Sequence, residues 1–380
     1  MLNNERLNNM SVGYYDVSDH KEHTIDWLAS MQQTYEFYKV DPITWKDQEL
    51  IHSIESCNIE RDLSNDTLGS ASFTCSEILD ECYIRTYLVC NQNGVRFKEC
   101  LGTHLAQTPY FDFDGKRKSI SMDGYTPLIE LKNNVPPIGY SLLKTDATHN
   151  TDILQTVFDI CSENMRAPVV YPGDSKDLYE NFVSNIDDTW FSFCSDLLAN
   201  AERTFSIEPD GKIRFEKVTE MSSLQPVWVF NDDNSSILLP SINDEADLYN
   251  IPNVVEVVYS SESGSFYSKV INNDPSSPVS TVARGREIVH RESNPNVTGV
   301  PTQAYIDKYA EQLLSDLSTL KHTVKYSHSY CPVRIGDCIL LNYKRAGITN
   351  VKAKVISQSI SCITGCMVEE AAMYTTKLWR

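Results

Sequence analysis

The chain has 380 residues and a formal net charge of −19, from 33 basic and 52 acidic residues. Its length predicts two to four domains with a sizeable core, and its 41% hydrophobic content fits a folded globular protein. The lysines and arginines are scattered along the chain, which excludes a phosphate-gripping surface and tight DNA binding but allows DNA to pass.

The N-terminus shows no targeting signal. The first ten residues are polar and rich in asparagine, without the basic start and apolar core of a signal peptide. No apolar run approaches the ~18 residues of a membrane span. We therefore expect a protein that is made in a cytoplasm, stays soluble there and has no membrane-spanning segment.

Residues 1–30 read as an irregular N-terminal arm, in which the apolar patch 26–31 is a candidate anchor on a neighbouring molecule. From Tyr35 the sequence becomes rich in β-forming residues, and an Asn-Gly dipeptide at 93–94 predicts a hairpin. We interpret residues 31–135 as a first small β-barrel.

A proline-rich boundary at 135–139 precedes a helical period, and residues 136–220 are predicted to be an α/β insert domain. One helix is expected from Ile153, with Thr151 as its N-cap, and a second over 178–183. A third is expected over 190–201, where apolar residues recur at helical spacing. A hairpin over 205–215 completes this domain.

Residues 221–380 are predicted to be a second β-barrel with one long helix, 302–320, packed on it. The run 253–259 is strongly strand-like. Toward the C-terminus, three β-rich runs over 338–343, 351–362 and 366–372 are separated by glycine-bearing turns, which is typical of an antiparallel meander. The predicted fold class is therefore mainly β with an α/β insert.

The sequence shows no motif of a catalytic centre or of a cofactor site, so we expect no catalytic, cofactor-binding or metal-binding residue and no enzyme activity. Residues 112–115 begin like a calcium loop but fail at Lys116 and Arg117, which predicts a plain turn. His20 and His23 form a close pair in the polar arm, where surface histidines are the simpler interpretation.

Eleven cysteines are present, and most lie in apolar runs, which favours buried thiols. A four-sulfur zinc site or a disulfide among Cys331, Cys338, Cys362 and Cys366 remains an alternative, although the spacing does not match paired zinc knuckles. Cys161 and Cys194 lie inside apolar helical stripes, the wrong environment for a catalytic thiolate.

Two groups of motifs carry a family resemblance. Near the N-terminus they are Tyr-x-Phe-x-x-Val-Asp-Pro-x-Thr-Trp at 35–45, Ser-Cys-x-Ile-x-Arg-Asp at 56–62 and Thr-Leu-Gly-Ser-Ala-Ser-Phe at 67–73. Near the C-terminus they are Arg-Ile-Gly-Asp at 334–337, Gly-Ile at 347–348, Val-Ile-Ser-Gln-Ser-Ile at 355–360 and Thr-Gly at 364–365. In this order they resemble the baseplate hub proteins of bacteriophage tails and related contractile injection particles.

The resemblance implies two tail-tube-like β-barrels in each subunit and a homotrimer that forms a ring of six barrels. Such a ring joins the six-fold tail tube protein to a three-fold central spike protein, contacts other baseplate proteins and lets DNA pass without tight binding. The protein would reside in the virion, at the tail tip, after assembly in the host cytoplasm. Strands 253–259 and 351–362 would form ring walls, and loops 260–265 and 272–280 would meet neighbours.

Two other classes of function remain open. A tail-associated peptidoglycan hydrolase would need a Cys–His arrangement or a carboxylate pair, and no residues stand out for either. A host-glycan binding module would present exposed aromatic side chains on one face, for which Tyr140, Tyr171 and Tyr179 are candidates.

Overall fold

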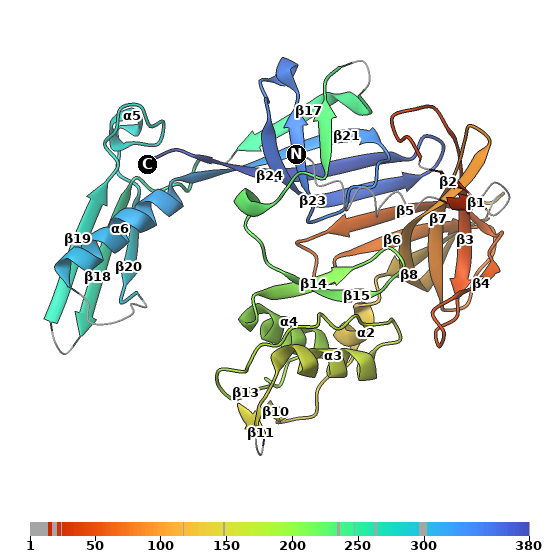
Figure 1. The fold of residues 1–380 in the computed structure, drawn as a ribbon, viewed down its shortest axis with the longest axis horizontal. Coiled ribbons are helices and arrows are strands. Elements are labelled where there is room, and N and C mark those ends of the chain that lie inside the picture. The colour runs from red at the N-terminus through yellow and green to blue at the C-terminus, as the bar shows by residue number, and fades with distance from the viewer. Residues whose placement is uncertain are drawn as a thin grey trace. The chain divides into compact units, whose positions relative to one another are not determined.

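The computed structural model describes residues 14–16, 21–23, 25–116, 118–146, 149–233, 236–246, 248–261, 264–295 and 302–379. The chain is mainly β with few helices, as the sequence predicted (Figure 1). It divides into two compact units, Met1–Ser241 with Tyr326–Ala371 and Ile242–Lys325 with Ala372–Arg380. None of the helices in the described residues is both long and apolar enough to cross a membrane.

The strands of the N-terminal half, up to the end of the insert, are β1 (Tyr14–Asp16), β2 (Lys21–His23), β3 (Gln32–Val40), β4 (Asp47–Leu50), β5 (Ile54–Asp62), β6 (Gly69–Cys75), β7 (Cys82–Gln92), β8 (Val95–Phe113), β9 (Lys118–Tyr125), β10 (Ser141–Leu142), β11 (Thr145–Asp146), β12 (His149–Asn150), β13 (Phe182–Val183), β14 (Arg203–Ile207) and β15 (Ile213–Lys217). The strands of the C-terminal half are β16 (Trp228–Asn231), β17 (Leu238–Ala246), β18 (Val254–Ser261), β19 (Gly264–Ile271), β20 (Val289–Ser293), β21 (Thr319–Ser329), β22 (Cys338–Asn342), β23 (Val351–Cys362) and β24 (Met367–Lys377). The α-helices are α2 (Ile129–Asn133), α3 (Ile153–Asn164), α4 (Trp190–Asn200), α5 (Thr281–Arg284) and α6 (Gln303–Leu317), and the short 3-10 turns are η1 (Met221–Ser223) and η2 (Lys344–Ala346).

One 13-stranded sheet links the two β regions that the sequence predicted. Its strand order is β17-β21-β24-β23-β5-β6-β9-β8-β7-β3-β4, and β22 joins β23 and β16 beside this path. The antiparallel pairing of β23 with β5, from Ser357 opposite Asp62 to Cys362 opposite Cys57, connects the closing strands to the first β region. We call this pairing the seam. The path is open among the described residues, so the two closed barrels predicted from the sequence are not seen.

The first β region forms where the sequence predicted it. The β7–β8 hairpin turns at Asn93 and Gly94, which have φ angles of 52° and 83°. Positive φ at both central residues matches the right-handed twist of the flanking strands and explains the Asn-Gly dipeptide. Inside this region Ile59, Phe73 and Leu88 are almost fully buried in one apolar core.

Trp27 belongs to the same core and does not anchor an arm on a neighbouring molecule. It is 7% exposed, and its ring meets Tyr330 at 5.2 Å and Phe97 at 6.0 Å between centroids. The patch predicted as an intermolecular anchor is therefore an intramolecular one, because the apolar pocket that receives Trp27 is supplied by its own chain.

The insert contains the two stronger predicted helices but not the weaker one. Asp152, and not Thr151, caps α3 by accepting the Leu154 N–H at 3.0 Å. The helix predicted over 178–183 is wrong: Leu178 is buried, Tyr179 is 82% exposed, and β13 pairs with β10. The four apolar residues of this run point to different surroundings, so strand pairing outweighs their helical spacing.

The α4 stripe behaves as predicted. Trp190, Phe193, Cys194, Leu197 and Leu198 are all buried, and a capping box at Thr189 starts the helix. Helices α3 and α4 pack against the β14–β15 hairpin in a core that also includes residues of the first β region (Figure 1).

The turn of the β14–β15 hairpin docks on the first β region through buried polar contacts. Trp45 Nε1 donates to the Asp210 carbonyl at 2.7 Å, and Arg85 Nη2 donates to the same carbonyl at 2.9 Å. Arg85 also forms an ion pair with Asp47 at 2.7 Å. Gly211 has a φ angle of +85°, and a Cβ there would lie 2.8 Å from the Trp45 ring. The close approach therefore requires glycine.

The second unit contains the three-stranded sheet β19-β18-β20, and α6 packs on one face of it (Figure 1). Val255 and Val257 meet Ile306, Ala310 and Leu314 in this core. The predicted strand 253–259 and helix 302–320 are therefore present as β18 and α6, and Thr302 caps the helix as expected. The correction concerns the sheet: β18 does not belong to the sheet of β22–β24. The predicted contact loop 260–265 includes residues 262 and 263, which lie outside the described residues.

Candidate functional site

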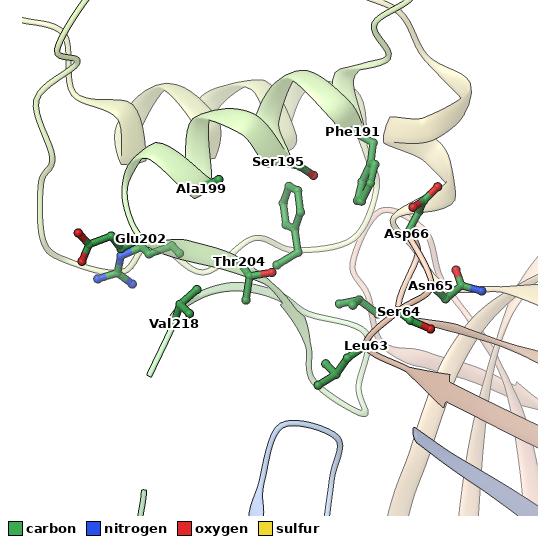
Figure 2. Close-up of a pocket in the computed structure, with 13 residues that line it drawn as sticks. Leu63, Ser64, Asn65, Asp66, Phe191, Ser195, Ala199, Glu202, Thr204 and Val218 are labelled. Atoms are coloured by element: carbon green, nitrogen blue, oxygen red, sulfur yellow. The ribbon is translucent and has the colours of Figure 1, made fainter. Parts of the chain in front are cut away.

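A groove of about 680 Å³ lies between α4, the turn that joins β5 to β6, and the start of β14 (Figure 2). Phe191, Ser195 and Ala199 follow one another at four-residue spacing, so one face of α4 forms a wall of the groove. The other lining residues are Leu63, Ser64, Asn65, Asp66, Leu68, Glu202, Arg203, Thr204, Phe205 and Val218. None of the lining residues is a histidine or a cysteine. The groove can receive apolar side chains.

A chain of buried polar side chains crosses the seam. Arg61 Nη1 donates to Gln358 Oε1 at 2.9 Å, across a directly opposed pair of β5 and β23. Gln358 Nε2 donates in turn to Glu370 Oε2 at 2.6 Å and to the Val333 carbonyl at 2.9 Å. Tyr326 donates its hydroxyl to the other oxygen of Glu370. Buried polar groups that are fully bonded specify one register, because a slipped strand would leave them without partners.

Glu370 faces a buried histidine inside this chain of contacts. His328 is fully buried, and its Nε2 lies 3.5 Å from Glu370 Oε2. Burial alone would lower the pKa of His328, but Cys331, whose Sγ lies 3.8 Å from Nδ1, and Glu370 together raise it well above its usual range. The raised pKa of His328 favours a protonated ring beside the Glu370 carboxyl, a partner that lowers the cost of burying a polar group.

A second buried carboxyl lies near the seam. Glu99 accepts a long hydrogen bond of 3.4 Å from the Tyr330 hydroxyl. Burial raises the pKa of Glu99 to about 7, although the charges of Arg334 and Arg61 oppose this shift. The buried site therefore favours the protonated carboxyl of Glu99 up to near-neutral pH.

A second cavity, of about 620 Å³, opens beside the seam between the β14–β15 hairpin and the turn at Arg334–Asp337. Arg61, Lys354 and His104 are among its lining residues. Burial, and after it the charge of Arg61, lower the pKa of His104 to about 3, so its ring is neutral. Its Nδ1 has no hydrogen-bond partner among the described residues. The neutral ring is 4% exposed and packs tightly over Gly102, where a Cβ would lie 2.6 Å from it.

Sequence reasoning missed the polar chain across the seam, although a signal existed. Arg61 follows Ile59, and Gln358 precedes Ile360, each at the two-residue spacing that puts side chains on one face of a strand. A polar residue on a core-facing position of each strand indicates a buried pair. The missing information was that these two strands are neighbours.

The four cysteines considered for zinc do not come together. Cys331 lies beside His328, and Cys338 on β22 lies opposite Lys354 on β23. The Cys366 thiol contacts the Tyr35 hydroxyl. Cys362 lies opposite Cys57 on β5. Across the described part of the chain, no three histidines, cysteines or acids form a group that could hold a metal ion. The structure therefore gives the zinc and the Cys362–Cys366 disulfide alternatives no support.

The candidates for the rival functions are also dispersed. Cys161 and Cys194 are buried, and the hydrogen bond between their thiols, with burial, raises the pKa of Cys194 well above its usual range. Tyr140 packs on Trp190 inside the insert, with ring centroids 5.0 Å apart, whereas Tyr179 is 82% exposed. These tyrosines do not act as one exposed set.

The remaining candidates are the turn at 112–115 and the histidine pair His20 and His23. The turn predicted at 112–115 is confirmed: Asp114 accepts the Lys116 N–H at 2.8 Å in the β8–β9 hairpin. The side chains of His20 and His23 lie outside the described residues.

No protein-family model matches this sequence, and no curated protein sequence matches it. Solved structures do match, over nearly the whole chain. The tail protein from Neisseria meningitidis MC58 superimposes with a TM-score of 0.60 at 12% identity, covering 90% of this chain and 97% of that one.

The chain has the fold of phage tail proteins. A second match, the 43 kDa tail protein of prophage MuSo2 from Shewanella oneidensis, has a TM-score of 0.56 at 11% identity and covers 89% of this chain and 97% of that one. The resemblance that the sequence motifs carry is thereby confirmed at the level of the fold.

Proposed function

We propose that this chain is a structural subunit of a phage-type tail, a baseplate hub that joins a six-fold tail tube to a three-fold central spike. One observation carries the proposal: two tail proteins share the fold over 90% and 89% of this chain and over 97% of their own lengths. A match of this extent leaves little of the chain for an additional catalytic domain.

The arrangement of the sheet supports a ring. Each subunit has two β regions, one running from β3 to β9 and one containing β22, β23 and β24, and the seam fixes them in a single sheet. Three subunits would supply six such regions, which is the number that continues a six-fold tube while keeping the three-fold symmetry of a spike. In this proposal the protein is a homotrimer.

A candidate contact surface is the end of the β8–β9 hairpin. Tyr110, Phe111 and Phe113 are 63%, 57% and 60% exposed there, and we call these three residues the aromatic arm. Clustered exposed aromatic side chains mark protein contacts, because a monomer gains nothing from holding them in water. Its partners in this proposal are the tail tube, the spike or another baseplate protein.

The charge supports passage of DNA through such a ring. With a net charge of −19, the subunit repels phosphate at long range, and a lumen of this character would let DNA slide without adhering. The proposed role requires no catalytic group.

The proposal is tested by imaging the purified chain by electron microscopy, alone and with a candidate tube protein and spike protein. We expect three-fold particles whose central ring has six similar segments and which attach to the end of a tube. Single 43 kDa particles that bind neither partner would contradict the hub. Clearing of peptidoglycan by the same sample would instead favour a hydrolase.

A further inference from the structure

The last pair of the seam consists of two cysteines. Cys57 on β5 and Cys362 on β23 are directly opposed in the antiparallel ladder. Both are buried, at 4% and 3% exposure, and neither is in a disulfide. The interaction with Cys57 is the largest cause that raises the pKa of the Cys362 thiol well above its usual range. Because the two residues are directly opposed, their thiols lie on the same face of the sheet.

The geometry of such a pair suits a covalent bond. Opposed residues of antiparallel strands have Cα atoms about 4.5–5.5 Å apart, and disulfides span Cα distances of about 4.4–6.8 Å. We propose that Cys57 and Cys362 form a disulfide when the folded protein meets a small disulfide oxidant such as oxidised glutathione. This bond would cross-link the two β regions at the seam.

The reaction is two thiol–disulfide exchanges. One cysteine thiolate attacks a sulfur of oxidised glutathione, forms a mixed disulfide and releases one glutathione thiolate. The second cysteine thiolate attacks the protein sulfur of that mixed disulfide and releases the other glutathione thiolate. Two protein thiols are oxidised, one glutathione disulfide is reduced to two glutathiones, and the protons of the protein thiols pass to the glutathione thiolates.

Cys362 is the residue through which the oxidant gains access. It precedes the turn Ile363–Gly365, whose three residues are exposed, and its pair is the last of the β5–β23 register. Ladder ends open more readily than ladder centres. The interaction with Cys57 and burial raise the pKa of Cys362 well above its usual range, so the closed pair is unreactive and exchange proceeds from the opened end.

Cys366 lies near Cys362 and is the thiol from which the test must distinguish Cys57. The Cys366 thiol contacts the Tyr35 hydroxyl, and the Cys90 thiol, on β7, is opposed to Gln33 of β3. Cys338 is buried in the same sheet opposite Lys354 and has no thiol opposite it. Cys338→Ser is therefore a matched control, a buried cysteine of this sheet whose loss leaves the pair intact.

The test is peptide mapping by mass spectrometry. Reduced wild-type protein is incubated with excess oxidised glutathione, the free thiols are blocked with N-ethylmaleimide, and the digest is analysed without reduction. We expect a linked pair of peptides carrying Cys57 and Cys362 in wild type and in Cys338→Ser, and its loss in Cys362→Ser and Cys57→Ser. If a serine variant does not fold, the wild-type map decides alone.

Three results would overturn the proposal: stable glutathione adducts on Cys362 without a link, a link from Cys362 to Cys366, or no oxidation of either residue in protein whose unfolded form reacts.

Amide exchange gives a second readout. Once the bond forms, exchange across 54–62 and 351–362 should slow by roughly thirtyfold, the factor equal to ~2 kcal/mol of disulfide stabilisation. Unchanged exchange in cross-linked protein would show that the bond does not hold the seam. The proposal depends on the seam alone and stands or falls independently of the hub function.

Discussion

Glutamine at position 99 should stabilise this protein at neutral and alkaline pH. Glu99 is 8% exposed, and burial raises its pKa from an ordinary 4.5 to about 7. Between these values the folded chain holds a proton that the unfolded chain has released, so stability falls as pH rises through this window. The amide of Glu99→Gln does not titrate, and its carbonyl can still accept from the Tyr330 hydroxyl.

The magnitude follows from the pKa difference. The difference between about 7 and 4.5, at about 1.36 kcal/mol per pH unit, corresponds to a cost of roughly 3 kcal/mol for the buried carboxylate well above pH 7. At pH 5 most of this cost is absent. The stability gained by Glu99→Gln should therefore grow by roughly 2 to 3 kcal/mol between pH 5 and pH 8.

The assay is urea unfolding at pH 5, 6, 7 and 8, followed by tryptophan fluorescence, because Trp27 packs on Tyr330 beside the buried carboxyl. Glu77→Gln, on an exposed residue, is the matched control for the loss of one negative charge. Parallel pH profiles for wild type and Glu99→Gln would refute the reasoning. So would an equal pH-dependent gain in the control.

Three further predictions concern the docking of the insert and the aromatic arm. Gly211→Ala should destabilise the protein by at least about 2 kcal/mol, because it combines a positive φ with a clash against Trp45. Gly94→Ala, with a similar φ and open space, should cost less in the same urea titration; equal losses would contradict the clash. Arg85→Met should cost roughly 3 kcal/mol by leaving Asp47 and buried carbonyls without their donor, and a neutral effect in thermal unfolding would contradict the docking role. Replacing the aromatic arm by serines should leave the melting temperature unchanged but reduce incorporation into tail particles, and normal incorporation would exclude the arm as a contact surface.

Local signals in the sequence predicted most elements of this fold. The Asn-Gly dipeptide at 93–94 located the β7–β8 hairpin, and the apolar stripe of 190–201 located α4. These signals work because turn geometry and helical periodicity are set by residues close in sequence. The helix predicted over 178–183 was wrong because the apolar residues of this run have different surroundings. A pattern of six residues does not distinguish that case from a short helix.

The order of the strands in the sheet could not be predicted from the sequence alone. Alternation in 351–362 shows which face of β23 is buried, but it does not show that β5, about 300 residues away, is the neighbouring strand. The two closed barrels were inferred by treating each β region separately, whereas the seam unites them. Likewise, 253–259 has the composition of a core strand, and only the structure shows that its core is formed with α6.

The candidate sites also divide into features that the sequence predicted and features that depend on strand pairing. The sequence correctly predicted that most thiols are buried, since the cysteines lie in apolar runs. It did not indicate the Cys57–Cys362 pair or the Arg61–Gln358 contact, because both depend on the pairing of distant strands. The motifs that resemble baseplate hub proteins include Arg61 and Gln358, so they coincide with the residues that hold the seam.

The most direct test of a trimeric hub is the molar mass of the purified chain in solution, measured by light scattering on a size-exclusion column over a concentration series. The account predicts a species close to three times 43.1 kDa that persists on dilution. A mass of 43.1 kDa at every concentration, also in the presence of tube and spike proteins, would contradict it.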